Sequence, residues 1–393
     1  MYRIGREEID AVTKVIESKQ LFKVNNALCY TEKFQASAAK HFGTEHVILM
    51  TSGNAALISA MVGLGIGPGD QVIVPAYTYI ATAMAVLATG AIPVIAEVDE
   101  TLTLDVQDVE KKITPHTKAV IPVHIMGFPC NMDAICALAK KHNIHVIEDA
   151  CQAIGGTYKG QSLGTIGIAG AFSFQQAKII SCGEGGALLT NDDTVFQRAM
   201  IYHDSNGIAF FGDQMDSFHV EQFCGVEYRT DEVKAAIMSC QLEKLDGILA
   251  DLKKNKQYFM EQLQDLYTFR PSHDKDGDCG VALAFSFETE ETARRFTEAV
   301  KPTIMGAHLP IDTGRHIYTN WTPILEKRGA VHPAMDPFKM EPNRDIVPDY
   351  TPDMCPKTLD LLSKTVYFRV SPDWTEERKA QLLDALRKAK EML

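Results

Sequence analysis

The sequence lacks the cysteine pattern of a disulfide or metal scaffold. Nine cysteines in 393 residues are too few for a disulfide framework. They stand at positions 29, 130, 136, 151, 182, 224, 240, 279 and 355, and none forms a Cys-x-x-Cys pair. This spacing argues against a zinc ribbon or a thioredoxin-type site. We therefore expect buried free thiols in a protein of a reducing compartment.

Positive charge is also scarce. Lys and Arg total 39 against 51 Asp and Glu, which gives a formal net charge of -12. Such acidity disfavours nonspecific binding to nucleic acid or to anionic membranes. The N-terminal residues Met1-Tyr-Arg-Ile-Gly-Arg-Glu-Glu contain no apolar core of a secretory signal. We expect a cytoplasmic protein with neither a nucleic-acid nor a membrane partner.

One stretch resembles a membrane span by length only. The 25 residues from Val72 to Ala96 carry no charge, but Pro75, Gly90 and Pro93 interrupt them. The pattern instead predicts a strand at 71–74, a helix at 80–87 and a strand at 93–98. This is a buried βαβ unit of a soluble protein.

Composition is that of an ordinary globular chain, with 46% hydrophobic and 23% charged residues. Short apolar runs predict further strands at 47–50, 119–124, 145–147, 171–174 and 186–189, with helices at 55–64 and 132–142. Continuous apolar strands between helices predict an α/β fold with a mostly parallel sheet covered on both faces. After Thr230 the pattern predicts helices at 231–266, 290–300 and 375–393, and strands at 281–287 and 365–370. We expect a large domain at 1–248 and a smaller C-terminal α+β domain at 249–393.

Three segments carry polar residues where a strand ends, which is where ligands collect in such sheets. Thr51-Ser-Gly-Asn-Ala-Ala could bind an anion at a helix N-terminus, although a plain helix cap explains it equally well. Glu148 and Asp149 end a buried strand, where a carboxylate needs a cation; alternatively both cap the next helix. Lys178 follows Ala171-Phe-Ser-Phe-Gln-Gln-Ala and precedes Gly183-Glu-Gly-Gly. Burial favours a neutral amine that can form a Schiff base, and a solvated lysine is the alternative.

Together the three segments supply what a pyridoxal phosphate (PLP) site needs: groups for a phosphate, an acid for a pyridinium nitrogen and a lysine for an aldehyde. In order and spacing the chain resembles the DegT/StrS family of PLP-dependent sugar aminotransferases, which have the type I aminotransferase fold. The resemblance is firm over residues 5–260 and looser beyond. The segments that carry it are Thr51-Ser-Gly-Asn-Ala-Ala-Leu, Val72-Ile-Val-Pro-Ala-Tyr-Thr-Tyr, Ile147-Glu-Asp-Ala-Cys-Gln-Ala, Phe172-Ser-Phe-Gln-Gln-Ala-Lys, Gly183-Glu-Gly-Gly-Ala and Glu227-Tyr-Arg-Thr-Asp-Glu.

The resemblance assigns roles to particular residues. Lys178 would hold PLP in a Schiff base and then act as the acid and base of the proton transfer. Asp149 would pair with the pyridinium nitrogen. The other cofactor contacts would come from Tyr79 on the ring, Gln152 near the 3-oxygen, and Gly53, Asn54 and Ser173 at the phosphate.

Two positions depart from the family pattern. Members commonly have Thr or Ala at the position of Asn54. Where they carry the Asn of Gly-x-Asn-x-Arg, which reaches the partner subunit's phosphate, this chain has Glu227. A carboxylate beside a phosphate is unfavourable, so we expect Glu227 to turn away and pair with Arg229 or Lys234.

Residues 148–167 look closest to enzymes that aminate the 8-keto form of the eight-carbon acid sugar Kdo. Substrate selection is expected in 307–321, where His308, Arg315 and His316 either meet an anionic substrate or are solvated surface residues. The resemblance implies a homodimeric aminotransferase that moves an amino group from L-glutamate or L-glutamine to a keto sugar, possibly nucleotide-linked. A PLP-dependent dehydratase or synthase and a noncatalytic regulator are the alternatives. Lys178 argues against the dehydratases, because the family's sugar 3-dehydratases carry His there.

Overall fold

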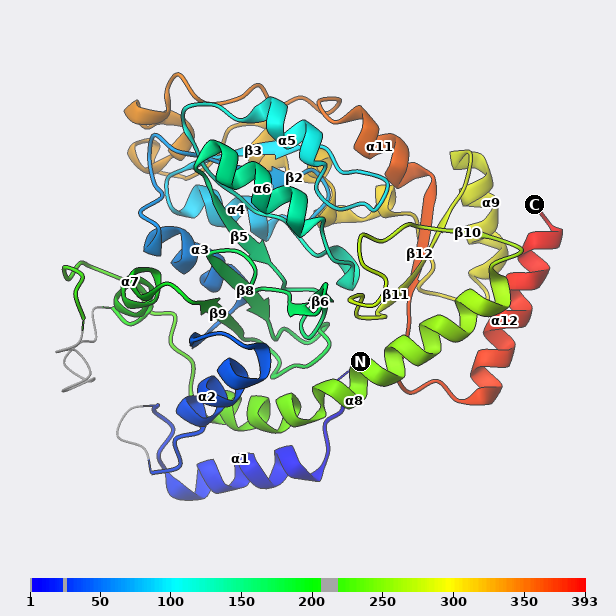
Figure 1. Ribbon diagram of the computed structural model, residues 1–393, viewed down its shortest axis with the longest axis horizontal. Helices are drawn as coiled ribbons and strands as arrows, with labels where there is room; N and C mark the ends of the chain where they lie inside the picture. The colour runs from blue at the N-terminus through cyan, green and yellow to red at the C-terminus, as the bar shows by residue number, and fades with distance from the viewer. Residues whose placement is uncertain (1, 24–26, 206–217) are drawn as a thin grey trace.

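The computed structural model describes residues 2–23, 27–205 and 218–393. Its helices are α1 Arg6–Ser18, α2 Tyr30–Phe42, α3 Gly53–Gly63, α4 Ala81–Ala88, α5 Val106–Lys112, α6 Met132–His142, α7 Asp193–His203, α8 Glu232–Leu263, α9 Glu290–Val300, α10 Thr322–Leu325, α11 Pro356–Ser363 and α12 Glu376–Glu391. Its strands are β1 His46–Met50, β2 Gln71–Pro75, β3 Ile92–Ala96, β4 Thr117–Val120, β5 His145–Asp149, β6 Thr157–Tyr158, β7 Gln161–Ser162, β8 Ala169–Ser173, β9 Gly186–Thr190, β10 Thr268–Phe269, β11 Ala282–Ser286 and β12 Thr365–Arg369 (Figure 1).

A seven-stranded sheet forms the centre of the molecule, in the order β1-β9-β8-β5-β4-β2-β3. The pairs β2–β3, β2–β4, β4–β5 and β5–β8 are parallel. Strand β9 runs antiparallel to both of its neighbours, β1 and β8. The expected α/β class with a mostly parallel sheet is therefore confirmed.

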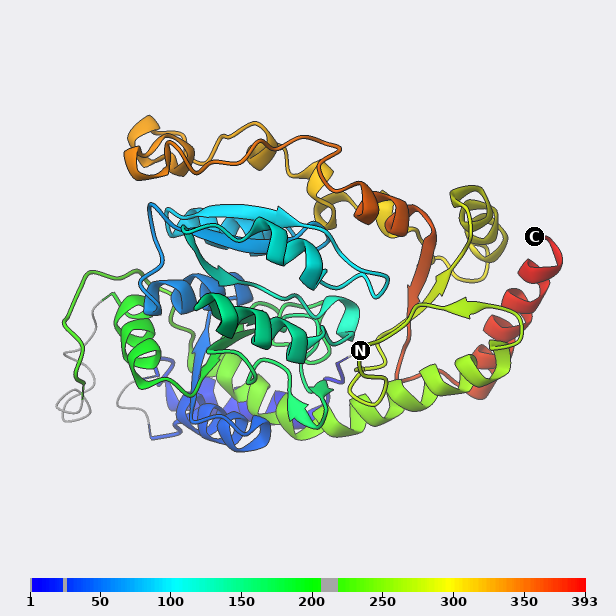
Figure 2. The ribbon, with the colours of Figure 1, turned by 45° about the horizontal axis from the view of Figure 1, so that its top comes forward.

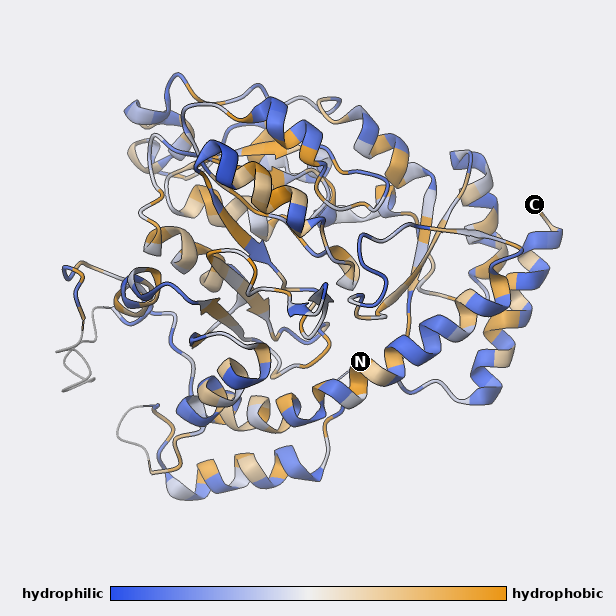
Figure 3. Ribbon diagram, in the orientation of Figure 1, coloured by the Kyte–Doolittle hydropathy of each residue, from blue (hydrophilic) through white to orange (hydrophobic). Residues whose placement is uncertain are grey.

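Successive residues of each central strand enter two different hydrophobic cores. Val47 and Leu49 pack on one face of the sheet with α2, α6 and α8, whereas Ile48 and Met50 pack on the other face with α3 and α7. The strands are correspondingly the most hydrophobic part of the chain (Figure 3). Burial on both faces explains why the strands are continuous apolar runs in the sequence. The run at 119–124 is shorter than expected, because regular pairing in β4 ends at Val120, just before Pro122, which has no N–H to donate.

The long uncharged stretch forms β2, α4 and β3, as the sequence predicts. Among the described residues, no helix has the length and apolar character needed to cross a membrane. The cysteines are free, but Cys224 is exposed and only Cys130, Cys279 and Cys355 are buried, so the expectation of uniformly buried thiols was wrong.

A second, antiparallel sheet of β10, β11 and β12 lies near the C-terminus and packs with α9 and α12. Helix α8 runs from beneath the central sheet to this smaller sheet (Figure 1). It crosses residue 248 without interruption, so the domain boundary at 248 stays a prediction.

The segment 310–363 crosses back from the smaller sheet to the central one and lies over β2 and β3 (Figure 2). It consists mainly of 3-10 turns and contributes Trp321 and Tyr318 to the second core. The Tyr350 hydroxyl donates to the Pro93 carbonyl at 2.7 Å, and the Gln71 side chain donates to Ile346 O at 2.6 Å. Part of the predicted small domain thus packs on the large sheet.

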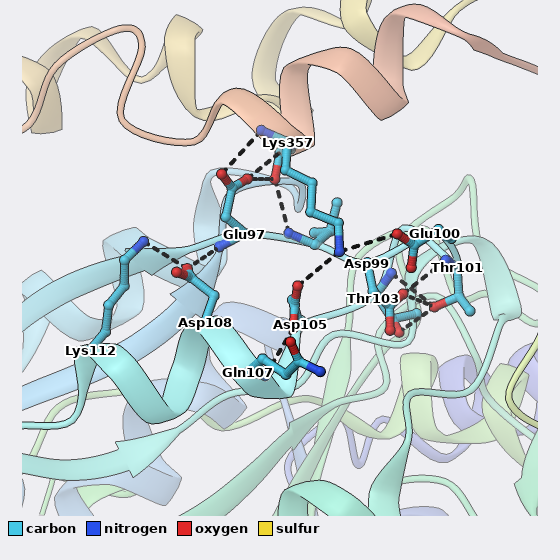
Figure 4. A network of polar contacts seen from close by, with 12 residues as sticks. Glu97, Asp99, Glu100, Thr101, Thr103, Asp105, Gln107, Asp108, Lys112 and Lys357 are labelled. Carbon is cyan, nitrogen blue, oxygen red and sulfur yellow. Dashed lines mark hydrogen bonds and ion pairs between the residues drawn. The ribbon is translucent and has the colours of Figure 1, made fainter. Parts of the chain in front are cut away.

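An acidic side chain fixes the end of this segment (Figure 4). The Glu97 carboxylate accepts the backbone N–H groups of Lys357 at 3.1 Å and Thr358 at 2.7 Å, in the first turn of α11. Lys357 in turn pairs with Asp105 at 3.0 Å and Glu100 at 3.2 Å. A carboxylate at a helix N-terminus satisfies its unpaired amides and its dipole. The contacts of Glu97 thus fix the start of α11, the helix from which the chain continues into β12.

Candidate active site

A cavity of about 420 Å³ opens where several central strands end. Asp149 ends β5, Ser173 ends β8, and the residues that follow β1 and β2 complete the wall. This is the expected edge for a ligand in an open α/β sheet. The cavity brings together every residue that the sequence predicts for the site: Gly53, Asn54, Tyr79, Asp149, Gln152, Ser173 and Lys178.

Asp149 is a buried carboxylate at the cavity wall, only 6% exposed. Its Oδ2 accepts the Thr82 hydroxyl at 2.8 Å, and its Oδ1 accepts the Cys151 amide at 3.2 Å. No described lysine, arginine or histidine forms an ion pair with it. A buried carboxylate with neutral partners alone is costly, so this position suits a cationic ligand atom.

Glu148, one residue earlier, points into the protein and is fully buried. It accepts the amides of Gly164, Ile166 and Gly167 at 2.6–2.9 Å and contacts His124 Nε2 at 3.0 Å. His124 Nδ1 accepts the Cys130 amide, so the ring donates its Nε2–H to Glu148. Alternation along β5 thus separates the two acids, and Glu148 has a structural role.

A cradle for an anion lies at the N-terminus of α3. The Ser52 hydroxyl caps the helix by accepting the Ala55 amide at 3.0 Å. A Cβ on Gly53 would stand 2.5 Å from Cys151 Sγ and 3.0 Å from Ser173 Cβ, so only glycine lets the start of α3 pack this closely against these two residues. The Asn54 side-chain amide donates to the Ala81 carbonyl at 2.9 Å, which joins α3 to α4. The backbone amides of Gly53 and Asn54, together with Ser173, are left to face an anion.

Lys178 lies in a tight turn between β8 and β9 and is half-buried at the cavity. Cys151 stands near it. Burial, reinforced by Asp149, raises the pKa of the Cys151 thiol well above its ordinary value, so the thiol stays protonated. That leaves Lys178 as the nucleophile among the described cavity residues. The Gln152 Oε1 accepts the Met126 amide at 3.2 Å, which fixes the side chain at the cavity rim.

Residues from the distant segment 314–321 close the cavity. His316 lines it and lies 5.3 Å from the Tyr79 ring, and Arg315 Nη1 donates to the Tyr79 hydroxyl at 3.4 Å. Burial, together with the positive charges of Lys178 and Arg369, lowers the pKa of His316 to about 4. The ring is therefore neutral at pH 7. His316 belongs to the cavity wall and not to the solvated surface, which was the alternative; Arg315 is exposed.

Sequence reasoning missed two residues of this wall. Arg369 ends the buried strand β12, lines the cavity and donates to the Ala177 carbonyl at 3.2 Å. A charge that ends a buried strand is the same signal that singled out Glu148 and Asp149. Thr82, which holds Asp149, carries no such signal, because a threonine inside an apolar helix is common.

Glu227 turns toward its neighbour in sequence. Its Oε2 lies 2.6 Å from Arg229 Nη2, and its Oε1 accepts the Arg229 amide at 3.1 Å. Arg229 also pairs with the buried Asp204. This is the pairing expected from the sequence.

Comparison with known proteins places this geometry in a family. The model of the DegT/DnrJ/EryC1/StrS aminotransferase family matches residues 2–320. The chain belongs to this family. It is thus a PLP-dependent transaminase.

Relatives within the family act on sugars. GDP-perosamine synthase of Caulobacter vibrioides is 38% identical over 267 residues, which cover 67% of this chain and 69% of the relative. The dTDP-3-amino-3,4,6-trideoxy-alpha-D-glucose transaminase of Streptomyces venezuelae is 43% identical over 218 residues, 55% of each chain. Among solved structures, an aminotransferase from Psychrobacter cryohalolentis superposes with a TM-score of 0.82 at 26% identity, covering 99% of this chain and 98% of that one. The chain therefore belongs among the sugar aminotransferases.

The residues present fit the family's cofactor. The Asp149 carboxylate, buried without a cation among the described residues, matches a protonated ring nitrogen. The N-terminus of α3, with Ser173 beside it on the cavity wall, matches a phosphate, and the single lysine of the cavity matches an aldehyde.

Proposed function

We propose that this chain transfers an amino group from L-glutamate or L-glutamine to a keto sugar that carries a negative charge. The observation that supports it is the cavity itself: Lys178, Asp149 and the α3 cradle stand together, with Arg369 and His316 on the wall beside them. A scaffold protein would need none of these groups at one place. The proposed substrate is the 8-keto form of Kdo or a related acid sugar, with a nucleotide-linked keto sugar as the alternative.

In this proposal each site residue has one task. Lys178 holds PLP covalently, and Asp149 pairs with the ring nitrogen. Ser173 and the first-turn amides of Gly53 and Asn54 hold the phosphate, Tyr79 lies against the ring and Gln152 near the 3-oxygen. The bound cofactor supplies an electron sink for the electron pair that remains when a substrate C–H bond breaks.

The protein's own groups carry the proton. As a free amine, Lys178 Nζ would take the proton from the donor Cα and would later give it up again as an acid. Thr82 and the Cys151 amide donate hydrogen bonds to the Asp149 carboxylate and fix its orientation. His316, neutral at pH 7, does not add a competing positive charge and can accept or donate a hydrogen bond to the sugar.

Arg369 supports an anionic sugar. It is an exposed guanidinium on the cavity wall, it forms no ion pair within the described chain, and only one of its hydrogen bonds is used, to Ala177 O. A guanidinium matches a carboxylate or a phosphate with two parallel hydrogen bonds. Both proposed sugar classes carry such a group.

The test is turnover of a panel of keto sugars with glutamate or glutamine, read by mass spectrometry, for wild type and Arg369→Gln. We expect at least a tenfold higher KM for the anionic sugar in the variant, with the donor half-reaction unchanged. Arg328→Gln, an exposed arginine paired with Glu326, is the matched control. If the variant impairs the donor half-reaction instead, Arg369 binds the amino acid. Turnover of uncharged sugars alone would contradict the proposal.

We also propose a homodimer. The N-terminal region exposes large apolar side chains: Ile4, Ile9, Ile16, Leu21 and Phe22, each 43–56% exposed. A contiguous stretch of such residues is typical of an interaction surface, and a two-fold dimer is the commonest closed assembly. Light scattering should give two chains or an even multiple. An active monomer would contradict this proposal.

A further inference from the structure

A second cavity of about 410 Å³ lies on the smaller sheet's side of the molecule. We call it the Arg270 cavity. It shares no lining residue with the active-site cavity, although the two are close: Met126 and Val281 line the first, Phe128 and Gly280 the second. Its walls come from the second half of α8, from β10 and from the loop that follows β10. The lining residues are Phe128, Lys253, Lys254, Lys256, Gln257, Met260, Phe269, Arg270, Ser272, Lys275, Asp276, Asp278, Gly280 and Ala284.

The lining is strongly cationic, in a chain whose formal net charge is -12. It contains four lysines and Arg270 against two acids, Asp276 and Asp278. Lys256 pairs with Asp278 at 2.7 Å, and Lys253 donates to the Asp276 carbonyl at 2.8 Å. Lys254 and Lys275 are exposed and form no ion pair within the described chain. Three positive charges therefore remain in excess at the cavity.

Arg270 is the deepest of these cations and is only 5% exposed. Its guanidinium carbon lies 3.9 Å from the centre of the Phe128 ring. Its Nε, Nη1 and Nη2 atoms have no hydrogen-bond partner among the described residues. Burial lowers the pKa of Arg270, against the opposing effect of Tyr77 and Asp278, to about 10, so it stays charged at pH 7.

A buried charge with no hydrogen-bond partner is costly to the fold, and proteins normally supply one. Stacking on Phe128 offsets part of the cost but leaves the N–H donors unused. The planar fork of a guanidinium matches a phosphate or carboxylate through two parallel hydrogen bonds. An excess of three positive charges suits a group that carries two or three negative charges better than a single carboxylate. The volume lies in the range of small-molecule sites.

We propose that the Arg270 cavity binds a phosphorylated small molecule, with a phosphate or diphosphate group on Arg270 and with Lys254 and Lys275 at the rim. The site is separate from the catalytic cavity. It offers the five N–H donors of Arg270 in the interior and the two exposed charges of Lys254 and Lys275 at the surface.

Inorganic pyrophosphate is the probe, titrated by calorimetry into the PLP-loaded protein at fixed ionic strength. With PLP bound, the catalytic phosphate cradle is occupied. We expect saturable binding that weakens at least tenfold in Arg270→Gln and to a smaller degree in the double variant Lys254→Gln, Lys275→Gln. The double variant changes only exposed side chains, so it tests the site even if Arg270→Gln does not fold.

Two controls separate this site from others. Lys301→Gln removes an exposed lysine outside the cavity and should bind pyrophosphate like wild type. Arg369→Gln, on the catalytic cavity, should also leave it unchanged. The proposal is overturned if wild type shows no saturable binding, if the rim variant binds as tightly as wild type, or if glutarate binds as tightly as pyrophosphate.

Discussion

Replacing Glu227 by asparagine, the residue that the resemblance leads us to expect at this position, tests how the cofactor phosphate is held. In the structure the Glu227 carboxylate is engaged twice by Arg229, at 2.6 Å through the guanidinium and at 3.1 Å through the amide. Arg229 is itself held by Asp204, which is only 1% exposed. The carboxylate is therefore held by a group that is itself anchored in the interior, and we expect it to stay away from the cofactor phosphate.

The two possible geometries predict very different effects of Glu227→Asn. The Glu227 side chain is 50% exposed, and an ion pair of that exposure contributes about 0–1 kcal/mol. If that pair is all that is lost, PLP affinity changes by less than about fivefold. A carboxylate held about 4 Å from a phosphate would instead repel it by about 4 kcal/mol at an effective dielectric constant of about 20. Its removal would then tighten PLP binding by orders of magnitude.

The measurement is the Kd of PLP, from absorbance titration of cofactor-free protein. Glu221→Asn is the matched control, because Glu221 is an exposed acid of the same region with no ion pair among the described residues. We expect both variants to stay within about fivefold of wild type. A tighter Kd by tenfold or more in Glu227→Asn alone would refute the reasoning and place the carboxylate at the phosphate.

Four further substitutions test the site and its surroundings. Lys178→Ala should bind PLP without a covalent link and lose transamination; borohydride reduction and peptide mapping of wild type should tag Lys178, and a tag on Lys159 would contradict the assignment. Asp149→Asn should keep the cofactor and lose most turnover. Glu148→Gln should keep the cofactor spectrum of wild type and lose about 1–3 kcal/mol of unfolding free energy. The opposite result for the two variants would mean that Glu148, and not Asp149, pairs with the cofactor. Burial and a nearby ammonium lower the pKa of His203 to about 3 from 6.5, so unfolding takes up a proton and stability falls as pH drops from 6.5 towards 3. In urea unfolding, wild type should lose about 2 kcal/mol more of its unfolding free energy between pH 7 and pH 5 than His203→Gln does. Equal losses in the two proteins would refute this prediction.

The central sheet could be predicted because each strand is buried on both faces and is therefore a run of apolar residues in the sequence. β2, β5 and β9 appear within two residues of their expected bounds. The antiparallel direction of β9 could not be predicted, since the direction of a strand leaves no mark in its composition. The path of the segment 310–363 could not be predicted either, because 3-10 turns leave no periodic pattern of apolar residues in the sequence. The contacts that hold the segment, such as the hydrogen bond from Tyr350 to Pro93 O, are single contacts.

The site residues could be predicted where a charged side chain stands next to an apolar segment of the sequence. Lys178 and Asp149 are charges next to apolar strands, and such a conflict marks a function. Arg369 carries the same mark at the end of β12. Arg270 does not, because it stacks on Phe128, a residue far away in the sequence, and the sequence does not display this contact.

Helix α8 has a mechanical consequence. Its 32 residues make a rod about 48 Å long that begins beside the Glu227–Arg229 pair and carries three of the four lysines of the Arg270 cavity in its second half. A tilt of about 5° at one end would displace the other by about 4 Å. Gly247, the one glycine in the rod, has open space where a Cβ would stand. The helix therefore bends at the lowest cost in free energy at Gly247. Gly247→Ala would stiffen α8 between its N-terminal end, beside Glu227 and Arg229, and the Arg270 cavity without disturbing either.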